Sequence, residues 1–358
     1  MTLRHLSVRD FRCIDSAEAE FDARCNVVSG PNASGKTSLL EAIFFLGRGR
    51  SFRAPRNETL VRRSSRELLV SGRLAAAGGG MRSVGVRYGR DGFQARAGGQ
   101  RVGSLAELAT VFPVQAIDPE VHRLVEEGPQ ARRRYLDWGV FHVEPTFVDQ
   151  WRRYQRALKQ RNAALRGGAA DAAVRAWDGE LIDTGRSLAT SRRVYFEALQ
   201  PVVAAVGERL LGTGVILALA DGWAHGTDLA TALDDAWPRD RDQATTHVGP
   251  HRADISIRVG GVVARHHVSR GQQKLAAAAM LLGQLRCDAT LGSPTSALLV
   301  DDPAAELDQA HLERLISLIA ELPCQLFVTA LDPDLTALQW LPEPRRFHVE
   351  HGKMRLLI

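Results

Sequence analysis

Residues 30–37 have the composition and spacing of a loop that binds phosphate. They fit the pattern G-x-x-x-x-G-K-[ST], with glycines where backbone N–H groups must turn toward an anion without a Cβ in the way. Lys36 would reach the β- and γ-phosphates, and the Thr37 hydroxyl would take one coordination position of Mg²⁺. The loop therefore predicts that the chain binds a nucleoside triphosphate. The predicted phosphate-binding residues are Gly30, Pro31, Asn32, Ala33, Ser34, Gly35, Lys36 and Thr37.

A pair of carboxylates follows a predicted buried strand later in the chain. Residues 297–300 are all apolar, and Asp301 and Asp302 come directly after them. This is the Walker B arrangement, in which an aspartate at the end of a strand helps to hold Mg²⁺. We expect Asp301 to act through water beside Thr37. We expect Asp302 to orient the attacking water or to accept its proton.

A third feature is the predicted start of a helix at Ser269, followed by Arg270, Gly271 and Gln272. A hydroxyl, several free N–H groups and the positive end of a helix dipole would converge there on an anion. An ordinary capped helix has the same residues, so this segment alone does not predict an anion site. It does so together with the phosphate loop and the Walker B strand. Thr329, at the end of a predicted core strand over residues 325–329, is placed to sense a γ-phosphate.

The elements around the phosphate loop predict an α/β lobe over residues 1–118. A short strand over residues 26–29 precedes the loop, and the helix after it is apolar almost all round, which is typical of a central buried helix. Gly47 is expected to end this helix. Strands are predicted over residues 68–73 and 82–88, with glycines between them.

The region from residue 132 to about residue 199 is predicted to be helical and is rich in arginine. A break at residues 167–168 separates two helices, and the second is expected to stop before Pro201. On the first helix one stripe is basic, and a solvated face and a DNA phosphate contact explain it equally well. That stripe contains Arg152, Arg156 and Lys159, and the apolar stripe contains Trp151, Tyr154, Leu158 and Leu165.

The chain then returns to α/β character, with a strand near residues 215–219 and a hairpin turning at residues 260–261. His251 lies in the loop before this hairpin. It could be a ligand or a base, but a lone histidine in a loop more often makes structural hydrogen bonds.

Composition places the chain among ordinary globular proteins of two or three domain-sized units. It has 358 residues, 45% hydrophobic and 24% charged, with a net charge of +5. Only four of the 46 basic residues are lysines, as a GC-rich genome would give, so the charge is weak support for nucleic acid. The four cysteines include no C-x-x-C pair, and the apolar run over residues 275–285 is too short for a bilayer. We expect a cytoplasmic protein with no membrane partner.

The order of the three features resembles the ABC-type ATPase head. In that family the signature helix of one subunit caps the nucleotide held by another, so the resemblance implies an ATP-dependent homodimer. It implies that Ser269, Arg270, Gly271 and Gln272 bind nucleotide in trans. It also makes Arg12 and Gln115 candidates for contacting the γ-phosphate or the metal-bound water. The implied catalytic residues are then Lys36, Gln115 and Asp302.

Within that group the chain resembles the RecF family of bacterial recombination-mediator ATPases. Lys36 and Ser269 are 233 residues apart, without the long heptad arrays of chromosome-structuring relatives. The resemblance covers almost the whole chain and rests on segments 11–12, 30–37, 39–43, 51–53, 128–129, 132–142, 159–165, 249–254 and 269–272. The chain departs from the family pattern at three positions. Val268 stands where leucine usually begins the signature, Ala305 stands where serine usually precedes Glu306, and Asp302 stands where most such ATPases have glutamate. Because aspartate is shorter, we expect slow hydrolysis.

The fold class implied is α/β, a P-loop ABC/SMC-type ATPase head with a mixed sheet around a central phosphate-loop helix, plus a mostly helical second lobe without a long coiled coil. The head would comprise residues 1–118 and 247–358, and the arm residues 119–246. The family further implies binding to gapped or junction DNA and work with RecR and RecO to load RecA. Its roles are DNA repair, replication, recombination and the SOS response, with weak, DNA-stimulated ATPase activity.

Two alternatives remain at this point. One is a nucleotide-binding subunit of a transporter, although Thr329 stands where such subunits have a switch histidine. The other is a structural DNA clamp that binds ATP with negligible turnover, which the aspartate at position 302 keeps open.

Overall fold

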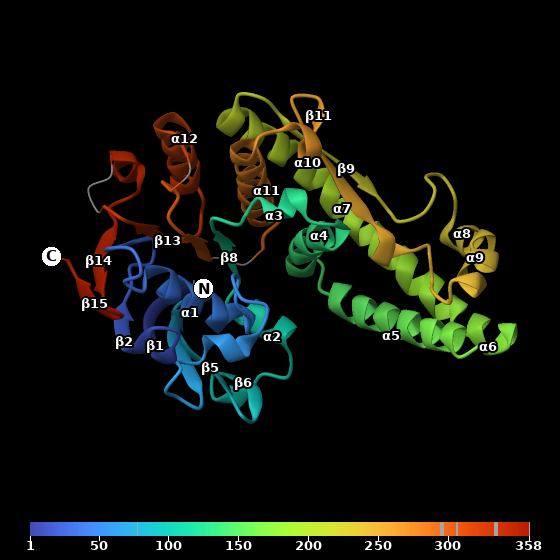
Figure 1. Cartoon of the computed structure of the whole chain (residues 1–358), viewed down its shortest axis with the longest axis horizontal. Helices are drawn as coiled ribbons and strands as arrows, with labels where there is room; N and C mark the ends of the chain where they lie inside the picture. Colours follow the sequence, from blue (N-terminus) through green and yellow to red (C-terminus); the bar gives the residue numbers. More distant parts are fainter. Residues whose placement is uncertain (77, 294–296, 306, 333–335, 358) are drawn as a thin grey trace. The chain divides into compact units, whose positions relative to one another are not determined.

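A computed structural model describes residues 1–76, 78–293, 297–305, 307–332 and 336–357. The chain divides into two compact units, Met1–Val121 with Ser293–Ile358 and, between them in sequence, His122–Gly292 (Figure 1). The predicted head included residues 247–292, which belong here to the second unit. This division reflects contacts within the fold and does not show which residues bind nucleotide together. The assignment of residues 247–292 to the head therefore stays a prediction.

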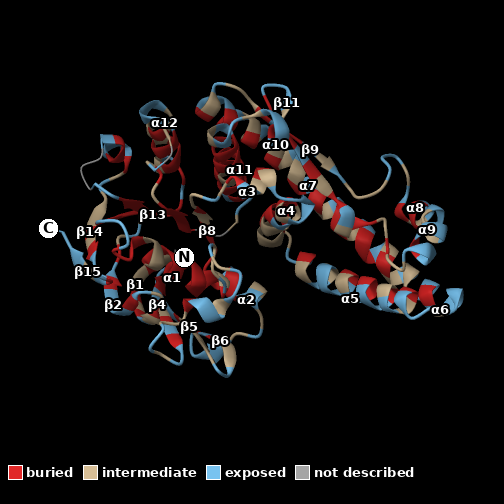
Figure 2. Cartoon of the chain, viewed as in Figure 1, coloured by how far each residue is buried: buried red, intermediate tan, exposed pale blue. Residues whose placement is uncertain are grey.

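The first unit contains a mixed sheet that carries the phosphate loop. Its strand order is β15-β14-β3-β13-β12-β8; the last five strands are parallel to one another, and β15 is antiparallel at one edge. The inner strands β3, β12 and β13 are buried along their whole length, as the red colour of β13 shows in Figure 2, and β12 is a continuous apolar run, as is typical of a parallel sheet covered on both faces. The strands are β3 (Cys25–Ser29), β8 (Val114–Ile117), β12 (Ala297–Val300), β13 (Gln325–Ala330), β14 (Arg345–Glu350) and β15 (Lys353–Leu356).

The same unit contains a six-stranded antiparallel sheet, and helix α1 (Lys36–Arg48) shares one apolar core with both sheets. The sheet order is β2-β1-β4-β5-β6-β7. Its strands are β1 (Thr2–Phe11), β2 (Ile14–Glu20), β4 (Leu68–Ala75), β5 (Met81–Gly89), β6 (Gly92–Ala97) and β7 (Gln100–Arg101). The other helices of the unit are η1 (Asn57–Leu60), α2 (Leu105–Val111), α12 (Gln309–Ala320) and η3 (Thr336–Trp340).

The expectation that Gly47 ends α1 was wrong by two residues. Gly47 lies inside the helix, where a Cβ would stand 2.4 Å from the carbonyl oxygen of Phe112. The left-handed C-cap is Gly49, with φ of 62°. Gly47 is therefore required for close packing, and Gly49 for the turn.

The second unit is mostly helical, with a three-stranded sheet in the order β11-β10-β9. Its strands are β9 (Val215–Ala220), β10 (Asp254–Val259) and β11 (Val262–Val263). Its helices are α3 (Arg123–Glu126), α4 (Pro129–Val143), α5 (Phe147–Arg166), α6 (Asp171–Arg175), α7 (Asp178–Leu211), α8 (Leu229–Asp235), α9 (Trp237–Asp242), η2 (Pro250–Arg252), α10 (Ala264–His267) and α11 (Arg270–Thr290). Helix α7 packs against α5, α11 and β9.

The predicted stop before Pro201 was wrong, because α7 continues through this proline for 34 residues in all. A proline inside a helix costs roughly 3 kcal/mol through its lost hydrogen bond and its ring. Leu199 and Val203, on either side of it, are both fully buried, so packing offsets that cost. The helix ends at Gly212, whose φ is 72°. Across the residues that the structure describes, no helix has the length and apolar character needed to cross a membrane.

Candidate functional site

The phosphate loop connects β3 to α1 in a conformation that glycine makes possible. Gly30 and Gly35 have φ of 147° and 113°, and a Cβ on Gly30 would stand 2.2 Å from the carbonyl oxygen of Val349 in β14. The N–H of Gly352, in the turn after β14, donates to the carbonyl oxygen of Ser34 at 2.8 Å. The hairpin of β14 and β15 therefore holds the loop from outside.

A cavity of about 290 Å³ opens at this loop. Within it the Nζ of Lys36 donates to the carbonyl oxygens of Gly30 and Pro31 at 2.7 and 2.9 Å. Desolvation lowers the pKa of Lys36, and the carboxylates of Asp302 and Asp301 oppose that shift. The cavity is lined by Cys13, Asn32, Ala33, Ser34, Gly35, Lys36, Thr37, Ser38, Arg53, Asp301 and Asp302.

The predicted carboxylate at the end of β12 meets the predicted hydroxyl of the loop. The Oγ1 of Thr37 lies 3.0 and 2.9 Å from the two carboxylate oxygens of Asp301, and the Oγ1 of Thr329 donates to the same carboxylate at 2.8 Å. Burial raises the pKa of Asp301, and the hydrogen bonds from Thr329 and Thr37 partly offset the shift. Thr329 is fully buried and its proton is engaged, so its contact here is with Asp301. Its role as a γ-phosphate sensor stays a prediction.

Asp302 lines the cavity with an unusual backbone. Its φ is 45°, in the left-handed region that residues other than glycine rarely adopt, and its N–H donates to the Thr329 hydroxyl at 2.8 Å. Strained residues of this kind concentrate at functional sites. The geometry is compatible with the predicted role of Asp302 toward water.

The residues present fit a triphosphate with Mg²⁺. The Oγ of Ser34 is buried and has no hydrogen-bond partner among the described residues, although it lies in the wall of the cavity. Such an atom is costly to bury unless a ligand satisfies it. Thr37 and Asp301 supply the oxygen ligands that Mg²⁺ prefers, so these two would hold the ion.

Two residues that were predicted to contact the nucleotide do not line the described part of this cavity. Arg12 and Gln115 are absent from the part of its lining that the structure describes. Arg12 instead donates to both oxygens of the buried Glu41 at 2.8 Å each, and Gln115 is only 5% exposed in β8. Their contact with a γ-phosphate stays a prediction, and for Arg12 it requires leaving Glu41.

Arg53 and Cys13 also line the cavity, but the sequence analysis did not assign them a role in the site. Arg53 is exposed, and its charge contributes to lowering the pKa of Asp301, against the effect of burial. A basic segment directly after the phosphate-loop helix was the available signal. No spacing rule points to Cys13, because it reaches the cavity through the turn between β1 and β2.

The start of α11 is accessible, as a contact in trans requires. Ser269 caps the helix in a capping box with Gln272, and both are exposed. A Cβ on Gly271 would meet nothing within 4 Å among the described residues. Arg270 is exposed and donates to His122. Binding of a partner's nucleotide by these residues stays a prediction.

The basic stripe of α5 faces solvent, since Arg152, Arg156 and Lys159 are all exposed. Trp151, at the start of the predicted apolar stripe, is 41% exposed, whereas Tyr154, Leu158 and Leu165 on that stripe are buried. Trp151 lies in the first turn and a half of α5 and is next to Arg152 in the sequence. An aromatic ring next to arginines is a feature of surfaces that bind nucleic acid, and contact with DNA stays a prediction.

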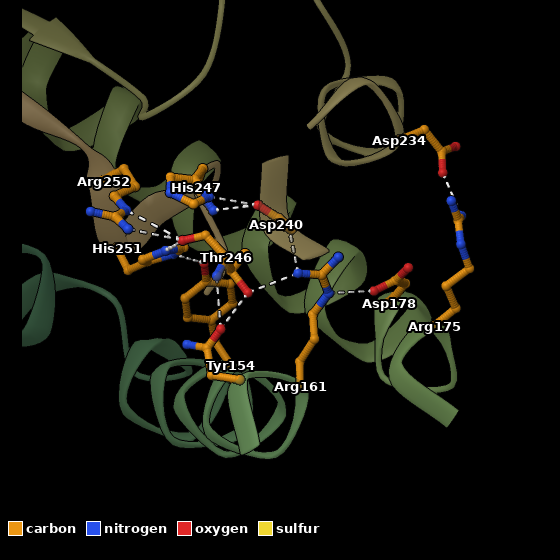
Figure 3. A network of polar contacts seen from close by, with 11 residues as sticks. Tyr154, Arg161, Arg175, Asp178, Asp234, Asp240, Thr246, His247, His251 and Arg252 are labelled. Atoms are coloured by element: carbon orange, nitrogen blue, oxygen red, sulfur yellow. Dashed lines mark hydrogen bonds and ion pairs between the residues drawn. The ribbon is translucent and has the colours of Figure 1, made fainter. Parts of the chain in front are cut away.

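The opposite face of α5 is fixed by a buried polar network (Figure 3). Arg161 is 0% exposed and donates to Asp178 and Asp240, each at 2.7 Å. His251 lies between the hydroxyl of Tyr154 at 2.6 Å and the carbonyl oxygen of Thr246 at 3.0 Å. Desolvation lowers the pKa of His251 to about 4, so it is a neutral structural histidine. The network determines which face of α5 is presented to solvent.

Of the predicted segment around residues 305–308, Glu306 lies outside the described residues. Asp308 accepts the N–H of His311 at 2.9 Å and so caps α12.

Comparison with known proteins gives consistent likenesses. A family model described as the RecF/RecN/SMC N terminal domain matches residues 2–339. The DNA replication and repair protein RecF of Pseudomonas fluorescens is 40% identical, over 99% of this chain and 98% of that protein. The protein of the same name from Pseudomonas syringae pv. syringae is also 40% identical, over the same shares.

Solved structures agree with this. The recombination mediator protein RecF-ATPrS of the RecFOR pathway has a TM-score of 0.85 at 25% identity, covering 99% of this chain and 98% of that one. The Smc head bound to the C-winged helix domain of ScpA has a TM-score of 0.61 at 16% identity, covering 100% and 97%. With the mixed sheet and the helical unit, these likenesses confirm the predicted fold class.

Proposed function

The chain belongs to the RecF family, and from this premise we propose that it is an ATP-dependent DNA-binding protein of replication and recombinational repair. The observation that carries the proposal is the cavity at the phosphate loop. There Lys36 and Thr37 meet the carboxylate of Asp301, and the buried hydroxyl of Ser34 lacks a partner among the described residues. A structure described as RecF with ATPrS supports ATP as the nucleotide.

Each residue of the cavity has a separate role in the proposal. Lys36 exchanges its two loop carbonyls for phosphate oxygens, and the loop N–H groups bind the remaining charge. Bound Mg²⁺ would supply charge neutralisation at the phosphates. Asp302 orients water, and because its side chain is short we expect slow turnover.

The switch in the proposal is a homodimer that ATP closes. Residues Ser269 to Gln272, of which Ser269, Arg270 and Gln272 are exposed, supply the second half of the site to a partner copy, and loss of the γ-phosphate favours the open form. A ligand shifts such an equilibrium only by its differential affinity for the two states. Signature residues that touch the nucleotide only in the closed dimer would provide that difference.

The proposed substrate is gapped or junction DNA, contacted by Arg152, Arg156 and Lys159 on α5. Salt-dependent phosphate contacts of this kind would place the dimer on DNA without reading its sequence. By membership of the family we propose that RecR and RecO act with this protein to load RecA. The name of the related structure, a recombination mediator of the RecFOR pathway, supports RecR and RecO as partners, and loading of RecA rests on family membership alone.

Sedimentation velocity with ATP, ADP and gapped duplex DNA tests the proposal. We expect a monomer with ADP, a dimer with ATP, and a DNA-bound dimer with ATP and gapped DNA. Reversing the charges of Arg152, Arg156 and Lys159 should weaken DNA binding at least ~10-fold and leave the ATP-driven dimer intact. Arg101→Glu, on the exposed edge of the antiparallel sheet, is the control. A chain that stays monomeric under all conditions would refute the switch.

A DNA clamp with negligible turnover is a second candidate, and the left-handed, short Asp302 is the observation that favours it. Steady-state phosphate release with and without DNA distinguishes the two. Family membership argues against the transporter alternative.

A further inference from the structure

The exposed arginine at the start of α11 is held by a buried histidine. The Nη2 and Nε of Arg270 lie 3.0 and 3.3 Å from the Nε2 of His122, the residue that precedes α3. His122 is 2% exposed. A carboxylate oxygen of Glu126, one turn further along α3, lies 3.5 Å from the same nitrogen. One edge of the Arg270 guanidinium is therefore fixed against α3.

This contact determines the state of the imidazole. Arginine has only donors, so Nε2 of His122 must accept and cannot carry a proton. The ring proton of neutral His122 then sits on Nδ1, which is buried without a hydrogen-bond partner among the described residues. Burying a donor without a partner destabilises the fold, because the group loses its hydrogen bonds to water and gains none in return. A leucine or phenylalanine would fill the same space without that cost, so packing alone does not explain the histidine.

We propose that His122 is a positioning residue that presents Arg270 to the nucleotide of a partner copy. This deepens the proposed function and rests on it. Because Nε and Nη2 of Arg270 are occupied by His122, the Nη1 edge is directed away from that contact. Nη1 has no hydrogen-bond partner in the described parts of the chain. That free edge has the donors for an oxygen of a phosphate.

Holding the side chain in advance lowers the ordering cost at closure. A free arginine loses rotamer freedom when it binds, and this loss of entropy weakens binding. Because His122 already holds Arg270 in the folded monomer, part of this entropy is lost on folding and does not weaken the dimer.

The main experiment measures the dimer dissociation constant with ATP for His122→Phe and His122→Gln. Phenylalanine fills the space but cannot accept, so we expect a dimer ~10-fold weaker. Glutamine offers an oxygen near the position of Nε2, so we expect it to restore the dimer to within ~3-fold of the natural chain. His266→Phe, an exposed histidine of α10, is the matched control and should have no effect. Thermal unfolding of each variant confirms that it folds.

A double-mutant cycle separates positioning from general destabilisation. In an Arg270→Ala background, His122→Phe should have no further effect on the dimer, because the arginine that it positions is gone. If the two substitutions weaken the dimer additively, His122 acts by another route and the proposal is wrong.

A local measurement keeps this proposal distinct from the proposed function. Arginine modification by phenylglyoxal in the nucleotide-free chain, followed by peptide mass spectrometry, reports the freedom of Arg270 without any dimer. We expect its rate to rise at least ~3-fold in His122→Phe, as loss of one charged hydrogen bond allows, with that of Arg156 unchanged. An unchanged rate at Arg270 would overturn the proposal. A raised rate in a chain that never dimerises would support the contact and refute the proposed function instead.

Discussion

The phosphate loop and the start of α11 are both predicted to bind the same anion, yet they are prepared for it differently. At the loop, Lys36 and Thr37 already have protein partners inside a cavity. At α11, Ser269 and Gln272 satisfy each other in a capping box on an exposed surface. A cavity can bind ligand within one chain, whereas an exposed helix end gains substantial affinity only when a second surface covers it. We therefore propose that the two regions act in sequence, with nucleotide binding first and dimerisation second.

Lys36→Met should have the largest effect, because it removes the only ammonium in the described lining of the cavity. We expect ATP affinity to fall at least ~100-fold, consistent with loss of a charge-assisted contact, and DNA-dependent dimerisation to be lost with it. Isothermal titration calorimetry measures the affinity. Lys353→Met, an exposed lysine of β15, is the control. Tight dimers of Lys36→Met would break the proposed order of events.

Arg270→Ala should separate the two regions. We expect monomer ATP affinity within ~2-fold of the natural chain and a dimer weaker by ~30-fold or more, the usual cost of removing a buried interfacial charge. Fluorescent-nucleotide titration and sedimentation with ATP measure the two quantities. A loss of monomer affinity would show that α11 acts in its own chain, which contradicts the comparison.

Asp302→Glu tests whether the short carboxylate limits turnover. A longer side chain would reach further into the cavity, so we expect phosphate release to rise ~3- to 10-fold, a modest share of a general-base effect. Asp302→Asn, which cannot accept a proton, should abolish DNA-stimulated release while ATP binding persists. Equal rates in all three chains would favour the clamp without turnover.

The last prediction concerns the stability of the fold and not nucleotide binding, and it is made at the far end of α11. Asp288 there is buried and accepts the hydroxyl of Tyr195 at 2.6 Å, and burial raises its pKa to about 7. A folded-state pKa above the unfolded one means that the protonated side chain stabilises the fold at low pH. This stability is lost as pH rises from about 4 through about 7. Asp288→Asn cannot ionise, so it should not show this loss, which amounts to roughly 1–3 kcal/mol of unfolding free energy in the natural chain.

Urea unfolding at pH 5 and pH 8 measures the contribution of Asp288. We expect the free energy of unfolding of Asp288→Asn, relative to that of the natural chain, to be higher at pH 8 than at pH 5, because the buried carboxylate of the natural chain is ionised at pH 8. His251, whose pKa is lowered to about 4, acts in the opposite direction in both chains and cancels in the comparison. A difference between the two chains that does not change with pH would show that Asp288 is not desolvated as described.

Sequence patterns predicted the elements whose signal is local. The loop and the start of α11 have motif residues in adjacent positions, and the strand before Asp301 is a plain apolar run. The predictions were wrong where the local structure depends on residues far away in the sequence. Pro201 is tolerated because α7 packs along its length, and Gly47 is needed because of Phe112. His122 and Arg53 were missed because their partners, Arg270 and Asp301, are far along the chain.

Strand β3 shows a consequence of this long-range dependence for synthesis of the protein. Its hydrogen-bonding neighbours on the two sides are β13 and β14, although β3 ends at Ser29. A growing polypeptide must therefore wait until residues 325–348 leave the ribosome before this strand gains either neighbour. Products of premature termination would have an intact phosphate-loop sequence but an unsupported loop. They would be targets for chaperones and proteases, and they would not compete with the finished protein for nucleotide.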